Sequence, residues 1–175
     1  MRASRNDGHK TMMKIGKAGL ELLKSFEKYV GHTYDDADPQ HRPVKYGDPY
    51  RGVLTIGYGH TGRYATPGMT MSLEQAETTL MEEDLPRYER AVNRAVTAPM
   101  NQNQFDAFVC LCYNIGVYAF ENKASAVRKF NEGDVEEAAK RFKLWNKSKG
   151  KVLEGLNRRR AAEVRLFLTP PEAFE

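Results

Sequence analysis

The sequence predicts an α+β protein in which a small β-hairpin lobe precedes a larger helical lobe. An amphipathic helical pattern opens the chain, a stretch rich in Gly, Pro, Asp and His follows, and the pattern is helical again from Ser72 to the end. The chain has 175 residues, of which 41% are apolar, so it can form one domain with a substantial core. We expect a flexible tail over residues 1–14 and a single domain over residues 15–175.

The first helix is expected at residues 15–30, as part of the helical lobe. Apolar residues recur there at helical spacing, with lysines and glutamates on the opposite side, and Gly31 is expected to end the helix. Glu27 lies near this end, among aromatic and apolar neighbours. Such surroundings favour the protonated form of a carboxyl group, which a general acid requires near neutral pH. The alternative is a solvated glutamate on the polar face of the helix.

The β lobe is expected at about residues 32–70, because this stretch contains a compact β-like run at 53–56 followed by two glycines around Tyr58. Before that run, residues 37–51 are expected to form a long loop. Three prolines keep this loop out of regular structure: Pro39, Pro43 and Pro49.

Two carboxylates in this region suggest acid–base chemistry. Asp36 follows Glu27 by nine residues, where the chain turns from the helix into the hairpin. Glycoside hydrolysis uses such a pair, one group to protonate the leaving oxygen and the other as a nucleophile or to activate a water. Asp35 is the other candidate for the nucleophile or water-activating group. Alternatively, the two aspartates could stabilise a turn, as aspartates in loops often do. The hydroxyl of Thr55 could hold a water against Asp36, or the residue could be present for its strand propensity.

His60, directly after the second glycine, allows two interpretations. It could titrate as a base. We favour a structural ion pair with a carboxylate of the next helix, either Glu83 or Asp84.

The helical lobe is expected at about residues 71–168, with local signals for each helix. Capping boxes begin two of them, Ser72 with Gln75 and Asn101 with Gln104. Pro86 should kink or break the first, and Gly116 should end the second. The remaining helices are expected at residues 123–130, 134–145 and 156–168.

The two cysteines, Cys110 and Cys112, lie two residues apart in a predicted helix and therefore point to different sides. They cannot bridge each other, and no metal-ligand spacing accompanies them, so we expect buried free thiols. The sequence indicates neither a metal nor a cofactor. No apolar run reaches the length of about 20 residues that a membrane span needs.

Seven spaced segments resemble the phage lysozymes of glycoside hydrolase family 24. They occur in the family's order and cover roughly residues 15–168: 25–27, 34–36, 52–60, 103–107, 113–116, 150–156 and 158–163. The resemblance implies a lysozyme-like fold, with the active-site cleft between the β-hairpin lobe and the helical lobe. It also implies a muramidase that cleaves the β-1,4 bond between N-acetylmuramic acid and N-acetylglucosamine in peptidoglycan, with inversion, for lysis of the host cell.

Position by position, the resemblance assigns Glu27 as general acid, with Asp36 and Thr55 positioning and activating the water. Inversion needs the two carboxyl groups roughly 6.5–9.5 Å apart, to leave room for that water. The family places its threonine six residues after the aspartate, whereas Thr55 follows Asp36 by nineteen. Loop-closure cost grows slowly with length, so we expect Thr55 to return to its place and the added loop to lie over or beside the cleft.

Three further positions match the family less specifically. Tyr113 matches an aromatic residue that faces the cleft, although it could equally be a core aromatic residue. Lys123 and Arg141 are weaker matches to substrate-binding positions.

The net charge of +4 and the basic end of the chain allow two interpretations. These cations could attract anionic wall polymers or outer-membrane lipid. Alternatively, some of the arginines could pair with nearby glutamates: Glu136, Glu137 or Glu163. The basic residues in question are Lys143, Lys147, Lys149, Lys151 and Arg158, Arg159 and Arg160.

The expected partner is peptidoglycan, and we expect a monomer that does not bind nucleic acid, because no recognition motif accompanies the charge. The N-terminal residues lack the apolar core of a secretory signal, so the protein should stay in the host cytoplasm until another factor releases it to the periplasm and cell wall. The alternatives are a lytic transglycosylase, in which a sugar hydroxyl replaces water, and a charge-driven module that acts on membranes or walls.

Overall fold

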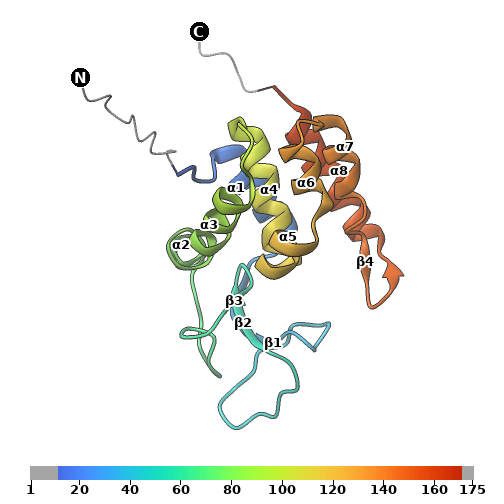
Figure 1. Cartoon of the computed structure of the whole chain (residues 1–175). Coiled ribbons are helices and arrows are strands. Elements are labelled where there is room, and N and C mark those ends of the chain that lie inside the picture. The colour runs from blue at the N-terminus through green and yellow to red at the C-terminus, as the bar shows by residue number, and fades with distance from the viewer. Residues whose placement is uncertain (1–11, 171–175) are drawn as a thin grey trace, which may run out of the picture.

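The computed structural model describes residues 12–170 and has two lobes (Figure 1). The predicted α+β class is confirmed: a small antiparallel sheet forms one lobe and a group of helices the other. The elements follow in the order α1 (Lys17–Phe26), β1 (Val30–Asp35), β2 (Leu54–Gly57), β3 (His60–Thr61), α2 (Leu73–Thr79), η1 (Leu80–Asp84), α3 (Leu85–Ala95), α4 (Gln102–Ile115), α5 (Val117–Lys123), α6 (Ser125–Asn131), α7 (Val135–Phe142), β4 (Lys147–Ser148), β5 (Lys151–Val152) and α8 (Glu154–Leu168).

The sheet of the β lobe has the order β1-β2-β3, with Tyr34 paired to Thr55 and Asp35 to Leu54. The loop between β1 and β2 does not hang free. Part of it returns along β1, where Pro43 forms an isolated bridge with Tyr34 and the Val44 N–H donates to the Thr33 carbonyl. The inserted loop therefore adds to the β lobe itself.

The first helix is shorter than predicted, and the expectation that Gly31 ends it is wrong. α1 ends at Phe26, and Glu27 already has an extended backbone. Gly31 lies in β1, because its carbonyl accepts from Met71 and the Tyr29 hydroxyl donates to the Met71 carbonyl at 2.5 Å. These bonds draw the chain into the β lobe before the helix can continue.

The start of α1 is fixed by a carboxylate from α4. Asp106 is fully buried and accepts hydrogen bonds from the N–H groups of Gly16 and Gly19 at 2.8 and 2.9 Å. It thus satisfies N–H groups that the first turn of a helix leaves free. A Cβ on Gly19 would lie 2.5 Å from the Asp106 Cβ, so only glycine allows this approach. The predicted tail falls largely outside the described residues, but Met13 within it exchanges hydrogen bonds with Asn93 of α3.

Both predicted capping boxes are present, at Ser72 with Gln75 and at Asn101 with Gln104. Pro86 does not break its helix. Proline lacks an N–H and clashes with the preceding turn of an α-helix, and here the turn before it widens into the π-helical segment η1, so that α3 continues from Leu85.

Two predictions for the helical lobe are wrong in detail. The helix expected at 123–130 is α6, which begins only at Ser125, and the separate helix α5 that ends at Lys123 was not predicted. The expectation of helix throughout the C-terminal half misses the hairpin of β4 and β5. This hairpin is two residues long on each side and turns through Lys149 and Gly150, both with positive φ, so it leaves almost no periodic pattern.

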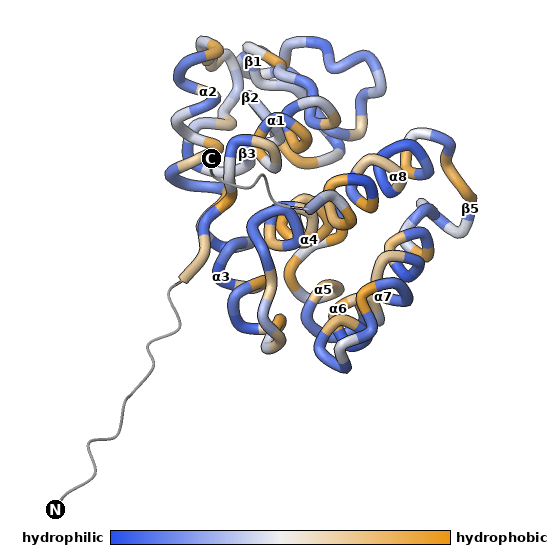
Figure 2. Tube along the Cα trace, turned by 90° about the horizontal axis from the view of Figure 1, so that it is seen from above, coloured by the Kyte–Doolittle hydropathy of each residue, from blue (hydrophilic) through white to orange (hydrophobic). Residues whose placement is uncertain are grey.

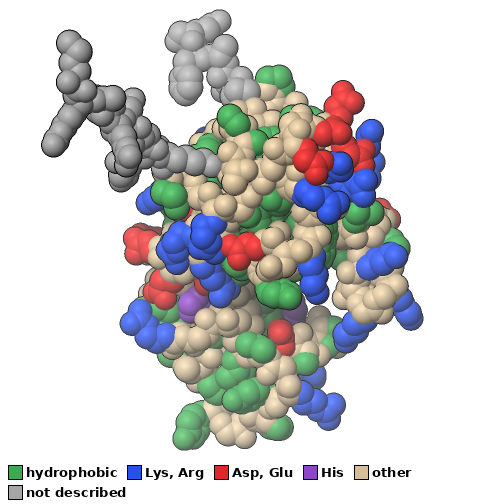
Figure 3. Space-filling view, in the orientation of Figure 1, with side chains coloured by type: hydrophobic (Ala, Val, Ile, Leu, Met, Phe, Trp, Pro, Cys, Tyr) green, Lys and Arg blue, Asp and Glu red, His purple; other side chains and the backbone are tan. Residues whose placement is uncertain are grey.

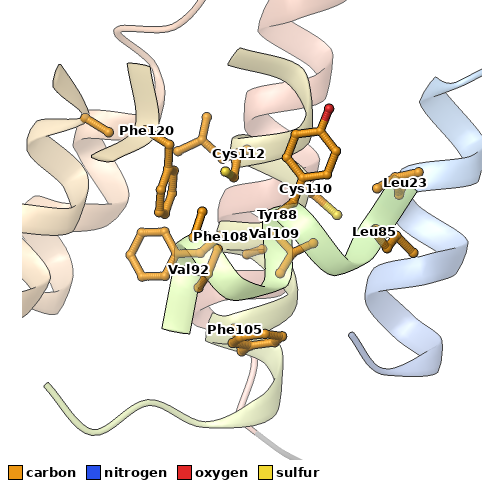
Figure 4. Close-up of a cluster of buried hydrophobic side chains, with 14 of the residues drawn as sticks. Leu23, Leu85, Tyr88, Val92, Phe105, Phe108, Val109, Cys110, Cys112 and Phe120 are labelled. Atoms are coloured by element: carbon orange, nitrogen blue, oxygen red, sulfur yellow. The ribbon is translucent and has the colours of Figure 1, made fainter. Parts of the chain in front are cut away.

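The core is built around α4, which lies in the middle of the helical lobe (Figure 2). The residues of α4 from Phe105 to Cys112 are all buried, and Figure 4 shows several of their side chains. Phe108 lies at its centre, with ring centroids of four other phenylalanines 5.2–5.8 Å away: Phe120, Phe130, Phe142 and Phe167. Cys110 and Cys112 are buried and free, as predicted, and burial raises the pKa of the Cys112 thiol to about 12. α4 therefore aligns α1, α3 and α8 around it.

Asp106→Ala should lower the free energy of unfolding by about 3 kcal/mol, because it leaves buried N–H groups at the start of α1 without an acceptor. Urea denaturation followed by circular dichroism measures this change. Asp134 is the exposed N-cap of α7 and accepts one hydrogen bond from the Glu137 N–H. Asp134→Ala should therefore lower the free energy of unfolding by only about 1 kcal/mol. Equal losses in the two variants would contradict the role assigned to Asp106.

Candidate active site

Glu27 lies where the helical lobe passes into the β lobe. It is the C-cap residue of α1, its N–H donates to the Leu23 carbonyl, and its side chain is 23% exposed. The Arg159 Nη1 atom donates to its Oε1 at 2.5 Å. One face of the carboxyl group is thus held by a cation while the group still reaches solvent.

Arg159 reaches Glu27 from α8 through the interior of the helical lobe. Its guanidinium also donates to Glu163 Oε1 at 3.2 Å and to the Cys110 carbonyl at 3.3 Å, and it lies 5.6 Å from the Phe26 ring centroid. Only Arg158 of the three consecutive arginines is exposed. Of the two interpretations of this basic run, internal pairing with Glu163 therefore holds for Arg159 and for Arg160, whose Nη2 lies 2.8 Å from the same Glu163 oxygen.

The two consecutive aspartates at the end of β1 differ sharply in their surroundings. Asp35 is buried and accepts backbone N–H groups from Ala37, Arg51 and Gly52. These N–H groups hold the pKa of the Asp35 carboxyl below its ordinary value, the bond from Arg51 contributing most. Asp35 thus joins the two ends of the inserted loop, and both of its oxygens are occupied.

Asp36 is exposed and continues the ladder of β1 with β2. Its N–H donates to the Val53 carbonyl at 3.1 Å, and its Oδ1 accepts from the Val53 N–H at 2.7 Å. Among the described residues, no hydrogen bond occupies Oδ2. Of the two aspartates, Asp36 is therefore the one whose carboxylate is available to a ligand.

Gly52 allows both aspartates to take these positions. A Cβ at this residue would lie 2.0 Å from Asp36 Oδ1 and 2.5 Å from Asp35 Oδ1, which no side chain can occupy. The close backbone approach brings the Gly52 N–H within 2.9 Å of Asp35. Gly52 is a site residue that the sequence did not single out, because only its place opposite two carboxylates explains it.

The charges of Glu27 and Asp36 both affect the pKa of the Tyr34 hydroxyl. Burial raises the pKa of Tyr34, and the charges of Glu27 and Asp36 raise it further. The Tyr34 side chain lies in β1, opposite Thr55 and between the helix that ends at Glu27 and the strand end that carries Asp36. The two carboxylates therefore lie within electrostatic reach of one buried ring.

Thr55 is buried in β2, and its hydroxyl donates to the Val53 carbonyl at 3.1 Å. Asp36 and Thr55 are consequently both bonded to Val53, which brings them together despite the long loop between them. The hydroxyl oxygen of Thr55 still has lone pairs that can accept a hydrogen bond.

His60 and Tyr113 each have a structural partner, and the charge of Glu27 contributes, after burial, to raising the pKa of Tyr113. His60 is buried and its Nδ1 lies 3.0 Å from Asp84 Oδ1, so of the two expected partners it is Asp84 that pairs with it, joining β3 to η1. Tyr113 is partly buried, and its hydroxyl donates to the Tyr58 carbonyl at 2.8 Å, which joins α4 to the β lobe.

Lys123 and Arg141, the weakest matches, have local partners. The Lys123 ammonium lies 5.4 Å from the Tyr118 ring centroid, and Arg141 Nη2 lies 2.6 Å from Glu137 Oε1. Among the described residues, no hydrogen bond or ion pair joins either of them to Glu27 or Asp36.

A hollow that the sequence did not predict lies between the end of α4 and the β4–β5 hairpin. Its volume is about 390 Å³, and its lining includes Asn114 and Ile115, the only tryptophan, Trp145, and Lys147 and Leu153 of the hairpin region. Asn114 also accepts a hydrogen bond from Arg160 at 2.9 Å. Figure 3 shows the surface hollowed between the helical lobe above and the β lobe below. Because the β4–β5 hairpin was not predicted, the sequence analysis did not anticipate that it lines this hollow.

A second hollow, of about 470 Å³, lies beside α2 and is lined by Tyr64, Met69, Glu74 and Glu83 among others. Neither hollow is lined by Glu27, Asp36 or Thr55. The candidate site is therefore located by its carboxylates and not by a hollow. Within residues 12–170, no three His, Cys, Asp or Glu side chains gather in a way that could hold a metal ion. None of the helices described there is long and apolar enough to cross a membrane.

Comparison with known proteins gives consistent matches. The family model described as phage lysozyme matches residues 40–163. The endolysin of Bacillus phage PZA is 39% identical over 155 residues, which are 89% of this chain but 55% of that protein, so the chain spans about half the length of this relative. The endolysin of Salmonella phage P22 is 36% identical over 162 residues, 90% of this chain and 100% of that protein. Among solved structures, the muramidase domain of SpmX from Asticaccaulis excentricus superposes with a TM-score of 0.75 at 41% identity, covering 90% of this chain and 99% of that one.

Asp35→Asn should change how stability depends on pH. A carboxylate with a lowered pKa in the folded protein stabilises it above the unfolded-state pKa of about 4, and this contribution is lost as the pH falls through the lower, folded value. The variant should be less stable at pH 7 and should lose less stability than the parent between pH 5 and about pH 2. Thermal unfolding across this range measures the difference. The control is Asp48→Asn, at an exposed aspartate of the loop tip that accepts a hydrogen bond from the Lys45 N–H. Parallel curves for Asp35→Asn and the parent would contradict the prediction.

Proposed function

The chain belongs to the phage lysozyme family, and we propose that it is a muramidase that hydrolyses the β-1,4 bond between N-acetylmuramic acid and N-acetylglucosamine of peptidoglycan. The observation that carries the proposal is the pair of partly solvated carboxylates at the junction of the lobes. Glu27 directly follows α1, Asp36 directly follows β1, and the charges of both raise the pKa of Tyr34.

Glu27 is the general acid. Its carboxyl group is fixed on one side by Arg159, whose guanidinium lies over the Phe26 ring, while its exposed part faces solvent. It gives its proton to the glycosidic oxygen as the bond from that oxygen to the anomeric carbon breaks, and the leaving sugar departs with a free hydroxyl group.

Asp36 and Thr55 position and activate the water. The free oxygen of Asp36 takes a proton from the water as its oxygen bonds to the anomeric carbon from the opposite face, which inverts the configuration. The Thr55 hydroxyl, held through Val53 beside Asp36, accepts a second hydrogen bond from that water. A lytic transglycosylase has no need of this carboxylate, so the exposed Asp36 favours hydrolysis.

The substrate fits the charge of the surface. Four lysines in and near the hairpin are exposed, Lys143, Lys147, Lys149 and Lys151. Of these, Lys147 lines the hollow that contains Trp145. Peptidoglycan carries carboxylates on its stem peptides, and exposed cations attract such a polymer. We further propose that the protein lyses its host as a monomer, after release from the cytoplasm to the cell wall.

Glu27→Gln should abolish the release of reducing sugar from purified peptidoglycan, by a factor of about a thousand or more, because the amide cannot donate the proton. The matched control is Glu21→Gln, on the same helix but highly exposed and 3.9 Å from Lys17. It should retain the parental rate. A Glu27→Gln protein that clears cells as fast as the parent would remove Glu27 from the mechanism and favour a charge-driven activity.

The products distinguish hydrolysis from transglycosylation. Mass spectrometry of digested peptidoglycan should show muropeptides with reducing N-acetylmuramic acid ends, because water is the nucleophile. In H₂¹⁸O, these ends should carry one ¹⁸O when the reaction is quenched early. Anhydro-muropeptides as the main products would overturn the proposed reaction and favour the transglycosylase.

Gly52→Ala should reduce kcat about ten- to a hundredfold, since the added Cβ must displace Asp36 by an ångström or more. Gly155→Ala is the control, because a Cβ there meets nothing nearer than 3.9 Å. Reducing-sugar assays with circular dichroism as a check on folding measure the effect. Parental kcat in Gly52→Ala would contradict the position assigned to Asp36.

A further inference from the structure

The hollow of about 470 Å³ beside α2 is acidic. It lies where the chain leaves the β lobe and enters α2 (Figure 1). Three glutamates line it, Glu74 of α2 and Glu82 and Glu83 of η1. Among the described residues, no lysine, arginine or histidine belongs to its lining. In a protein with a net charge of +4, this hollow is a local reversal of charge.

Two of these three carboxylates have no counterion. Glu83 Oε1 lies 3.4 Å from an Arg63 nitrogen, whereas Glu74 and Glu82 have no ion-pair partner within residues 12–170. Glu74, Thr78 and Glu82 recur at four-residue intervals and all line the hollow, so they share one face of α2 and η1. Eight residues of helix rise on the order of 10 Å, so the two unpaired charges are well separated.

The rest of the lining is apolar or carries hydroxyl groups. Tyr64, Met69 and Met71, from the segment that follows β3, form its apolar part. Thr79 lines the hollow and is only 8% exposed, yet its hydroxyl has no hydrogen-bond partner in the described part of the chain. A largely buried hydroxyl without a partner is costly. It therefore points to a ligand that supplies the missing hydrogen bond.

A single metal ion does not fit this arrangement. Nowhere in residues 12–170 do three His, Cys, Asp or Glu side chains gather closely enough to hold a metal ion, so the three glutamates do not converge on one point. Carboxylates that are spaced along an apolar surface instead match cations that are spaced along an apolar chain. A linear polyamine has this pattern, because methylene segments separate its ammonium groups.

We propose that the hollow beside α2 binds a linear aliphatic polyamine. Two ammonium groups of the ligand pair with Glu74 and Glu82, and a methylene segment between them lies against Tyr64 and Met69. The hydroxyl of Thr79 accepts a hydrogen bond from a further nitrogen of the ligand.

The lining favours a free polyamine over a peptide that contains several lysines. Such a peptide would bring a backbone carbonyl for each ammonium group, and those carbonyls need donors. Within the described residues, the lining provides no cationic donor for them. The inference goes beyond the proposed muramidase activity, because Glu27, Asp36 and Thr55 do not line this hollow.

The affinity should be modest and should depend on salt. Ion pairs with exposed carboxylates contribute little each, so we expect a Kd of about 0.1 to 1 mM at low ionic strength. Salt screens such pairs, and the Kd should rise about fivefold at physiological ionic strength. Because the ligand binds the folded chain, it should also raise the Tm.

Titration of the full chain with spermidine tests the proposal, followed by NMR of ¹³C-methyl-labelled methionines. The methyl signals of Met69 and Met71, assigned through their leucine variants, should shift. The signal of Met100, which does not line the hollow, should stay in place. MgCl₂ at the same ionic strength should not reproduce the shifts. No shift at a spermidine concentration about ten times the expected Kd, or an equal shift with MgCl₂, would overturn the proposal.

The double variant Glu74→Gln with Glu82→Gln should raise the Kd for spermidine about tenfold, because both unpaired charges are lost. The matched control is Glu21→Gln with Glu136→Gln. It changes the net charge by the same amount at exposed residues that do not line the hollow, and it should keep the parental Kd within about twofold. Equal losses in the two double variants would mean that net charge alone attracts the ligand, which overturns the site.

Thr79→Val removes the hydroxyl with little change in shape and should raise the Kd about two- to fivefold. Circular dichroism checks that each variant is folded. A parental Kd in Thr79→Val would overturn the placement of the ligand against α2, and trilysine that binds as tightly as spermidine would overturn the assignment to a free polyamine. These measurements need no peptidoglycan: a parent that binds spermidine but releases no reducing sugar would refute the muramidase and leave the polyamine site standing.

Discussion

The ion pair between Glu27 and Arg159 is the interaction on which the site depends. It joins residues 132 positions apart, from the first and last helices of the chain. Neither helix could bring its charge there alone. α4 packs against both and offers the Cys110 carbonyl as a third partner for the guanidinium. The buried core around α4 is therefore what sets the position of the proposed acid.

The β lobe supplies the other half of the site by dividing two tasks between adjacent aspartates. Asp35 closes the inserted loop with three backbone hydrogen bonds, and one oxygen of Asp36 has no hydrogen-bond partner within residues 12–170. Because successive residues of a strand point to opposite sides, the buried bonds of one carboxylate hold the other outward. Gly52 makes this arrangement possible by leaving the space that a side chain would fill. The length of the loop matters little, since its ends are fixed beside Asp36.

α8 brings three charged side chains into the interior of the helical lobe, those of Arg159, Arg160 and Glu163. A carboxylate and two guanidiniums in a core of aromatic rings are costly, and several of their atoms have no partner in the described part of the chain. One of these charges, the guanidinium of Arg159, donates to Glu27 where the helical lobe passes into the β lobe. Residues at a site commonly depart from what stability alone would select.

The sequence alone determined the features that depend on neighbours along the chain. Capping boxes, apolar periodicity and the nine-residue interval from Glu27 to Asp36 are local patterns, and they predicted the class, the helical lobe and the positions of the two carboxylates. Only the tertiary structure decided which aspartate is free, which arginines turn inward and where Tyr113 and Gly52 lie. Asp35 and Asp36 are chemically identical in sequence, and Arg158, Arg159 and Arg160 form one run. These residues differ in the partners that packing brings to them from distant parts of the chain. Burial and hydrogen bonding between distant segments, rather than local propensity, therefore determine the role of each polar side chain.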